Sequence, residues 1–284
     1  MTHLTVPKTY KLYIGGAFPR SESGRVYEVT TAKGAFLANA AKASRKDARD
    51  AVVAARAALS GWAGATGYNR GQVLYRVAEV LEGRRAQFVD EIAAGEGVTA
   101  VVAGTQVDAA IDTWVWYAGW ADKYLQIAGN GNPVSGPYFN LSTPEATGVV
   151  AVVAPQDSSL LGLASVIGPA VTTGNTVVVL ASEALPLSAI SLAEVFATSD
   201  VPGGVINVLT GSAAEIAPWL ASHADVNGLD LAGADTLDWI ELQMSAAETL
   251  KRVLTPVGGI PSRSIERMLA FTETKTVWHT KSMI

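Results

Sequence analysis

Few residues in this sequence combine the side-chain types that enzymes use for covalent catalysis. Ser222, His223 and Asp225 supply the three types of a hydrolase triad, but near neighbours in one turn point in different directions. We therefore expect them to serve a helix end and a turn. Ser158 and Ser159 are the other candidate nucleophiles, yet no base stands near them in the sequence, which favours polar residues at a helix start. We assign no catalytic residue.

Metal and thiol chemistry have equally few candidates. The sequence contains no cysteine, which removes disulfides, thiolate metal ligands, iron–sulfur clusters and a cysteine nucleophile. The three histidines, His3, His223 and His279, are scattered, so we expect no histidine zinc site, whereas a magnesium site built from carboxylates stays open. Neither a GxGxxG phrase after a strand nor a GxxxxGK(S/T) loop occurs. We assign no metal ligand and no standard phosphate loop.

The composition indicates a folded globular protein of 284 residues. Hydrophobic residues make up 49% and charged residues 17%, below the usual charged share of about 25%, so much surface must become buried within one subunit or between several. The formal net charge is -5 and no stripe of lysine and arginine occurs, so we expect no nucleic-acid partner. Residues 1–16 lack the apolar run of a secretory signal, which favours a cytoplasmic location.

The hydrophobic pattern changes near residue 148. Before it, residues 10–31 alternate like a short β-meander, and helical periodicities follow at 44–61, 69–94 and 107–127. Ser44 and Asp47 form a capping-box-like start of the first helix. After it, apolar runs at 148–154, 176–180, 205–209 and 226–231 alternate with helical segments at 160–173, 186–198 and 213–221. Because this alternation is typical of βαβ units, we predict an α/β fold with a doubly wound parallel sheet.

The uncharged stretch 158–182 is long enough to raise the question of a membrane span. Gly162, Gly168, Pro169 and Gly174 interrupt it, so we interpret it as buried helix, turn and strand, and expect no membrane partner. Residues 235–254 continue as a helix. A link rich in proline and glycine, 255–262, then leads to a strand-like segment at 274–279. Five aromatic residues on the third helix fit core and interface better than a ligand site: Trp114, Trp116, Tyr117, Trp120 and Tyr124.

Several phrases occur in an order that resembles the aldehyde dehydrogenase superfamily. They are Leu12-Tyr13-Ile14-Gly15-Gly16, Tyr117-Ala118-Gly119-Trp120-Ala121-Asp122-Lys123, Gly174-Asn175-Thr176-Val177-Val178 and Val201-Pro202-Gly203-Gly204-Val205-Ile206-Asn207-Val208-Leu209-Thr210-Gly211. The first is similar to the family's N-terminal strand pair, and the second to the helix before its oligomerisation strands. The last two are similar to connections within its cofactor domain. The resemblance covers residues 10–231 and implies a dehydrogenase-type cofactor domain.

The tail also resembles this family. Val257-Gly258-Gly259 and residues 271–277 are similar to the extreme C-terminus of a full-length enzyme, and only about one helix fits between Leu231 and Val257. The family's catalytic domain supplies the cysteine nucleophile and the glutamate base behind a Leu-Gly-Gly turn. It needs about 100–200 residues, so we expect it to be absent. The resemblance implies a cofactor domain at 1–254, with oligomerisation strands near 135–142, and a linker and oligomerisation tail at 255–284.

The cofactor half departs from the family where the chemistry is carried. The family's oxyanion-stabilising Asn has Asp157 in its place, and a carboxylate would repel a developing oxyanion. The ribose-binding lysine is missing, while Ser182 and Glu183 remain and, with Gly211, form the vestigial cofactor site that the resemblance implies. Asp235 stands at the position where, in the family, the helix that binds the cofactor's pyrophosphate begins. Its carboxylate would cap that helix and repel a bound phosphate. We expect no cofactor, with NAD as the remaining candidate.

The sequence resembles a pseudoenzyme. It lacks the nucleophile, the base, the oxyanion donor and the ribose-binding lysine, but keeps the sequence phrases that serve packing. The nearest likeness is the second, cysteine-free module of the sixteenth aldehyde dehydrogenase family. We expect a non-catalytic subunit that joins a full-length catalytic aldehyde dehydrogenase in a hetero-oligomer, or forms a homo-oligomer, through residues 135–142 and 275–279. Shortening the chain before Phe271 should then abolish assembly. The alternatives are an NAD(P)-dependent component whose active site a partner subunit completes, a nucleotide-sensing regulator, and a decayed reading frame.

Overall fold

A five-stranded parallel sheet forms the centre of the computed structural model, which describes residues 6 and 8–281. Its strands, in the spatial order β7-β6-β5-β8-β9, are β5 (Val149–Val153), β6 (Thr176–Leu180), β7 (Ile206–Leu209), β8 (Gly228–Asp230) and β9 (Arg252–Leu254). The valine-rich strands β5 and β6 are buried along their whole length, as strands covered on both faces must be. The expected α/β fold with a doubly wound parallel sheet is confirmed.

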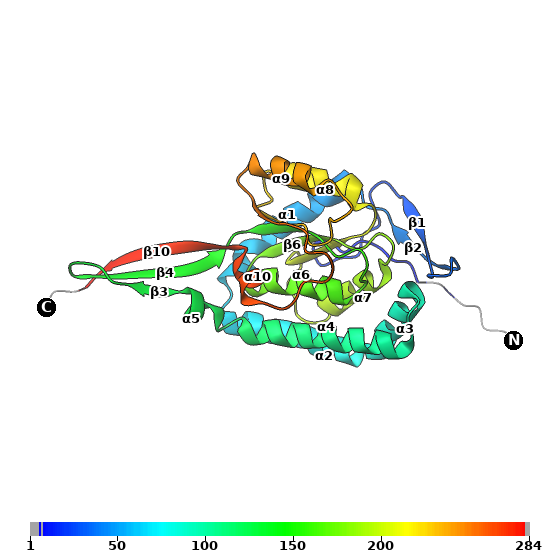
Figure 1. Ribbon diagram of the computed structural model, residues 1–284, viewed down its shortest axis with the longest axis horizontal. Coiled ribbons are helices and arrows are strands. Elements are labelled where there is room, and N and C mark those ends of the chain that lie inside the picture. Colours follow the sequence, from blue (N-terminus) through cyan, green and yellow to red (C-terminus); the bar gives the residue numbers. More distant parts are fainter. Residues whose placement is uncertain (1–5, 7, 282–284) are drawn as a thin grey trace.

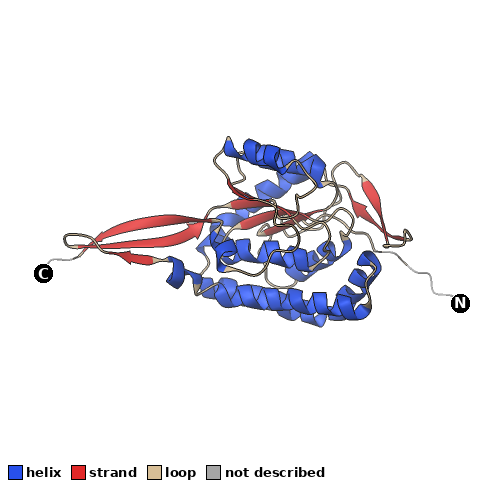
Figure 2. Cartoon of the chain, viewed as in Figure 1, coloured by secondary structure: helices blue, strands red, loops and turns tan. Residues whose placement is uncertain are grey.

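Helices cover both faces of this sheet (Figure 1, Figure 2). One face carries α1 (Arg45–Gly64), α8 (Ala213–Ser222) and α9 (Trp239–Ala247). The other carries α6 (Leu161–Thr172), α7 (Leu187–Ala197) and α10 (Ile265–Leu269), with α2 (Gly67–Gly83), α3 (Arg85–Glu96) and α4 (Ala100–Trp120) outside them. Because side chains alternate along a strand, Val149 and Val153 of β5 join the first core and Val150 and Val152 join the second.

The helical segments begin and end differently from the expected ones. The expected helix 69–94 is two helices, α2 and α3, which separate at Arg84 directly after the poor helix former Gly83. The expected helix 107–127 begins earlier, because Thr99 caps α4 by accepting a hydrogen bond from the Val102 amide, and it ends at Trp120. The predicted capping box of α1 is present, with Ser44 and Asp47 bonded reciprocally.

The sequence did not predict the strands at residues 252–254 and 36–41. Residues 235–254 do not form one helix, because the chain turns after α9 through Leu250, whose φ is 56°, and β9 then pairs in parallel with β8. The expected meander at 10–31 is also incomplete. Its strand β1 (Val26–Thr30) pairs with β2 (Phe36–Ala41), while Tyr13 forms a single antiparallel bridge to Val208 of β7. Residues 158–182 form α6, a turn and β6 as expected, and none of the described helices combines the length and apolar character needed to cross a bilayer.

A second, three-stranded antiparallel sheet projects from the body as an arm (Figure 1). It contains β3 (Asn130–Asn132), β4 (Tyr138–Ala146) and β10 (Thr272–Thr280) in the order β10-β4-β3, and the short helix α5 (Tyr124–Ala128) leads into it. The nine residues of β10 pair with all nine residues of β4. Both segments that the sequence assigned to oligomerisation, 135–142 and 275–279, therefore lie side by side in this arm, which throughout refers to β3, β4 and β10.

The root of the arm is held by a buried arginine. Arg70 of α2 donates to the carbonyls of Trp62, Ala63 and Ala65 at the end of α1 and to Thr172 at the end of α6. Its second amino group donates to the Tyr124 hydroxyl of α5 at 3.3 Å. The negative ends of two helix dipoles thus surround one cation, which explains how the guanidinium is buried with no carboxylate partner among the described residues.

The tail is also anchored in the body. Arg267 of α10 pairs with Asp230 at the end of β8, and the Asp230 side chain is 1% exposed. Phe271 fills the space beside Gly228, where a Cβ atom would lie 2.7 Å from its ring. The Asn175 side chain donates to the Phe271 carbonyl at 2.9 Å. The segment that leads into β10 is therefore part of the core.

Candidate functional site

The carboxyl ends of the parallel strands meet at one edge of the sheet, which is where ligands of doubly wound proteins bind. β5 continues into residues 154–159, β6 into Ser182 and Glu183, β7 into Gly211, and β8 into residues 231–235. The topology thus brings the sequence-predicted Ser182, Glu183 and Gly211 to the same edge as Asp157 and Asp235. We call this region the edge site.

Gln156 ties the ends of β5 and β6 together. Its side-chain amide donates to the Ala154 carbonyl at 2.7 Å, and its side-chain oxygen accepts from the Glu183 amide at 3.1 Å. Its main-chain carbonyl accepts from the Ser182 hydroxyl at 2.7 Å, and that hydroxyl accepts in turn from the Leu185 amide at 3.1 Å. The single hydroxyl hydrogen of Ser182 is therefore committed to the protein itself. Ser182 therefore has no hydroxyl hydrogen left for a ligand, and its oxygen already accepts a hydrogen bond from the Leu185 amide.

Glu183 and Gly211 share a third neighbour that the sequence did not indicate, Tyr27 of β1. Burial raises the pKa of the Tyr27 hydroxyl, the Glu183 carboxylate raises it further, and the Gly211 backbone amide acts in the opposite direction. The hydroxyl oxygen is buried without a hydrogen-bond partner among the described residues. No signal in the sequence links these three positions, because each lies on a different element.

The two acidic substitutions at the edge site are both exposed, but one does not have its expected role. Asp157 faces solvent in the loop after β5. Asp235 does not cap α9: a turn intervenes, and the helix begins four residues later with Asp238 as its cap, whose carboxylate accepts from the Glu241 amide at 3.1 Å. A sequence pattern fixes the approximate start of a helix, whereas a cap depends on the turn that precedes it.

The serine pair after β5 has a carboxylate within reach, contrary to the expectation that no base lies nearby. The Ser159 hydroxyl and its backbone amide both donate to Glu96 at the end of α3, at 2.7 and 2.9 Å. Both serines are buried, however, and the Ser158 hydroxyl accepts from the Gly162 amide at 2.9 Å in the first turn of α6. The adjoining void measures about 10 Å³, too small for a substrate. Glu96 thus fixes the loop rather than activating a nucleophile.

The crevice between β5 and β8, where the strand order reverses, is filled by the protein. The Gly233 amide donates to the Val153 carbonyl at 2.9 Å, and a Cβ atom on Gly233 would lie 1.9 Å from the Ala154 carbonyl oxygen. Ala232 and Ala234 beside it are fully buried. A ligand at this edge must therefore lie to one side of the usual crevice.

The other candidates for chemistry do not assemble into a site. The Ser222 hydroxyl donates to main-chain carbonyls of α8, and Nδ1 of His223 accepts from the Asp225 amide at 3.1 Å, so the three side chains form no relay. The His223 ring packs edge-on against Trp219, and burial lowers the pKa of His223. Among the described residues no three acidic or histidine side chains gather closely enough to hold a metal ion. His3 lies outside the described residues.

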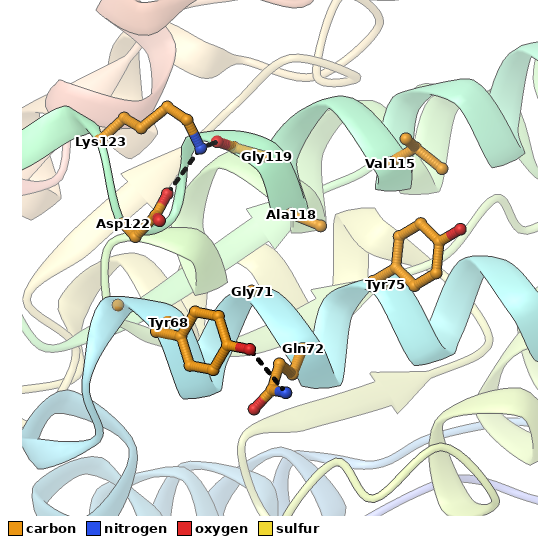
Figure 3. A pocket seen from close by; sticks show the side chains of 10 residues that line it. Tyr68, Gly71, Gln72, Tyr75, Val115, Ala118, Gly119, Asp122 and Lys123 are labelled. Carbon is orange, nitrogen blue, oxygen red and sulfur yellow. Dashed lines mark hydrogen bonds and ion pairs between the residues drawn. The ribbon is translucent and has the colours of Figure 1, made fainter.

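Two cavities flank the helices. One of about 270 Å³ lies between α8 and α9 near the edge site, lined by Leu237, Asp238 and Leu242 among others. A groove of about 510 Å³ lies between α2 and α4, remote from that site. Figure 3 shows Tyr75 of α2 beside Val115 of α4, and Tyr68 further along α2, where its hydroxyl accepts from the Gln72 side chain. The aromatic cluster of α4 itself is mainly core, since Trp114 and Tyr117 are fully buried.

Known proteins share this arrangement. The profile of the aldehyde dehydrogenase family matches residues 18–265. The chain belongs to that family. It is 33% identical over 257 residues to retinal dehydrogenase 2 of Homo sapiens, covering 89% of this chain and 49% of that protein. It is 32% identical over 251 residues to an aldehyde dehydrogenase of Aspergillus niger, covering 87% and 50%. The structure of the NAD+ complex of aldehyde dehydrogenase from Bacillus cereus superposes with a TM-score of 0.81 at 28% identity, covering 87% and 50%.

This aldehyde dehydrogenase family member spans about half the length of the curated relatives it matches. The position of Val257-Gly258-Gly259 differs from the one expected. The segment follows β9 directly, within the matched residues, and lies at the end of the parallel sheet rather than beside β10. Its preceding residue is Pro256. The chain therefore has no carboxylate in front of the glycine pair, where the family resemblance places a glutamate base.

Proposed function

We propose that this chain is a non-catalytic aldehyde dehydrogenase-like subunit that assembles with a full-length aldehyde dehydrogenase and supports or regulates it. The observation that carries the proposal is the arm, which projects beyond the helices of the body, with only the short α5 at its root among the described helices (Figure 1, Figure 2). Three strands with a hydrophobic face are about the smallest sheet that is stable in water, and this one projects from the body with large apolar side chains exposed. The arm therefore has the character of a contact surface.

Apolar side chains are exposed on both faces of the arm. Phe139 and Leu141 alternate along β4 and are 57% and 46% exposed, so they share one face. Trp278 of β10 is 59% exposed and packs edge-on against Tyr138 on the opposite face, with ring centroids 5.9 Å apart. Large apolar side chains gathered on one projecting element are typical of protein–protein contacts. β10 also presents a free strand edge.

The edge site supports the non-catalytic part of the proposal. The chain has no cysteine to form a thiohemiacetal, and Pro256 stands where a base would be expected. Asp157 would place a negative charge where a developing oxyanion needs a donor. Gln156 and Ser182 satisfy each other, so the groups that remain at this edge serve the loop. Scaffold residues are kept while reactive groups are replaced.

The test is co-expression with a full-length aldehyde dehydrogenase from the same cells, followed by native mass spectrometry. Replacing Phe139 and Leu141 together by aspartate should abolish the complex, because two charges would enter its apolar contact. The matched control is Val101→Asp on α4, where the native side chain is 80% exposed and distant from the arm, and it should assemble normally. Complex formation by the double aspartate variant would refute assembly through the arm.

Shortening the chain before Phe271 is not a clean test, although the sequence suggests it. Phe271 is 2% exposed and its carbonyl accepts from the Asn175 side chain and the Thr147 amide. Truncation would therefore damage the core as well as remove β10. Surface substitutions on the arm separate loss of assembly from loss of folding.

A second candidate function is an NAD-dependent component whose active site a partner subunit completes. The Glu183 carboxylate favours it, since it is exposed at the edge site and no described residue pairs with it. The cavity between α8 and α9 lies nearby. Calorimetric titration with NAD distinguishes the two candidates: saturable heat that is lost in Glu183→Ala supports cofactor binding, and silence at millimolar NAD removes it.

A further inference from the structure

β1 has an unpaired edge that faces a slot in the body of the protein. Within the part of the chain that the structure describes, the strand pairs only with β2, and its sheet has no third member. In such a ladder every second residue directs its N–H and C=O groups away from the partner strand. No backbone hydrogen bond joins the β1 residues 26–30 to a described element other than β2. These outward groups are therefore available to a further strand.

The slot beside this edge is an open groove with two walls. Residues 27–32 form one wall, and the loop 183–185 after β6 forms the other wall together with Gly95 of α3. The volume of the slot is about 340 Å³. Ala32 closes one end by packing against Gly97, where a Cβ atom would lie 2.6 Å from the Ala32 side chain. The slot therefore has the length of one short strand, and the volume of a small ligand site.

The polar groups around the slot are acidic or unsatisfied. Glu28 and Glu183 line it, both are exposed, and neither forms an ion pair with a described residue. The hydroxyl of Tyr27, which also lines the slot, is buried without a hydrogen-bond partner among the described residues. Carboxylates without cations complement a basic ligand.

We propose that this slot binds an extended, basic peptide segment of a partner protein, which adds as a third strand to the free edge of β1. The backbone of the segment would pair with β1, and its lysine or arginine side chains would lie against Glu28 and Glu183. Strand addition of this kind draws affinity from main-chain hydrogen bonds and specificity from alternate side chains. This surface is separate from the arm, so the inference does not rest on the proposed function.

The test uses a fluorescent peptide of alternating lysine and valine, measured by anisotropy against the full chain. Binding should be saturable and should weaken about tenfold in Glu28→Lys and in Glu183→Lys, which corresponds to about 1.4 kcal/mol. The matched control Glu248→Lys reverses an exposed charge after α9 and should leave affinity unchanged. Amide exchange of residues 26–30 should slow when the peptide is bound, because backbone pairing protects N–H groups.

Four results would overturn the proposal. Equal binding by a peptide of alternating glutamate and valine would remove the charge argument, and so would charge reversals that leave the affinity unaltered. Equal binding by a lysine–valine peptide N-methylated at alternate positions removes strand pairing, because that backbone cannot donate. Self-association of the free chain that Glu28→Lys abolishes would assign the slot to a second copy instead.

Discussion

The buried pair between Asp230 and Arg267 should govern how firmly the tail is attached. Among the described residues, Arg267 is the one cation that contacts the Asp230 carboxylate, whose side chain is 1% exposed. Arg267→Met removes this cation and leaves the carboxylate, within the described part of the chain, with one hydrogen bond, from the Ala232 amide at 3.0 Å. Removing one partner of a buried ion pair costs about 3–5 kcal/mol, because the remaining charge is left uncompensated. We expect a loss of this size in the free energy of unfolding at neutral pH.

The same argument predicts a rescue and a pH dependence. Replacing both residues, Asp230→Leu with Arg267→Met, leaves no buried charge and should restore stability to within about 1 kcal/mol of the parent. Burial raises the pKa of Asp230, and Arg267 opposes that rise. In Arg267→Met the folded-state pKa is therefore higher still. A carboxyl with a raised folded-state pKa contributes stability below its unfolded pKa of about 4 and loses it as pH rises through the folded value.

Urea unfolding at several pH values measures these effects. The defect of Arg267→Met should be largest near pH 8, should shrink toward pH 5, and should be absent from the double variant. A single variant within about 1 kcal/mol of the parent at pH 8 would contradict the reasoning, as would a double variant no more stable than the single one. The second outcome would mean that Arg267 stabilises the tail by packing and not by its charge.

Two further substitutions test the positions that hold the edge site and the arm. Arg70→Met should lower the free energy of unfolding by about 3 kcal/mol or more, because carbonyls at the ends of α1 and α6 lose their buried donor. Urea unfolding measures this loss. A loss below about 1 kcal/mol would contradict the interpretation that Arg70 caps both helices. Gly233→Ala should prevent native folding, because its Cβ atom would lie 1.9 Å from the Ala154 carbonyl oxygen. The control Gly61→Ala, in open space on α1, should raise the melting temperature slightly. A soluble Gly233→Ala protein that unfolds cooperatively would refute the close-packing argument.

The sequence predicted the centre of the fold because apolar runs are unambiguous there. Four expected strands correspond to β5, β6, β7 and β8, and the connections between them fall at glycine and proline as predicted. β9 escaped prediction because Arg252, Val253 and Leu254 are too few to show a period and directly follow a true helix. β2 was missed because Phe36 is exposed and alanines dominate the rest of the strand, so alternation is weak.

The edge site shows why long-range contacts resist sequence reasoning. The family resemblance singled out Ser182, Glu183 and Gly211, and in the structure they lie at one edge because parallel strands end together. Glu96 bonds to Ser159 although 63 residues separate them, and nothing in either segment indicates the other. Asp230 and Arg267 likewise find each other only through the return of the tail. The assignment of Ser182, Glu183 and Gly211 to cofactor binding stays a prediction.

The central claim, assembly through the arm with a catalytic relative, is tested most directly by native mass spectrometry of the protein purified from its own cells. The account predicts a stoichiometric complex with a full-length aldehyde dehydrogenase, whose activity falls when the arm carries aspartate at Phe139 and Leu141. A solitary monomer, or a homo-oligomer that the aspartate variant leaves intact, would contradict it.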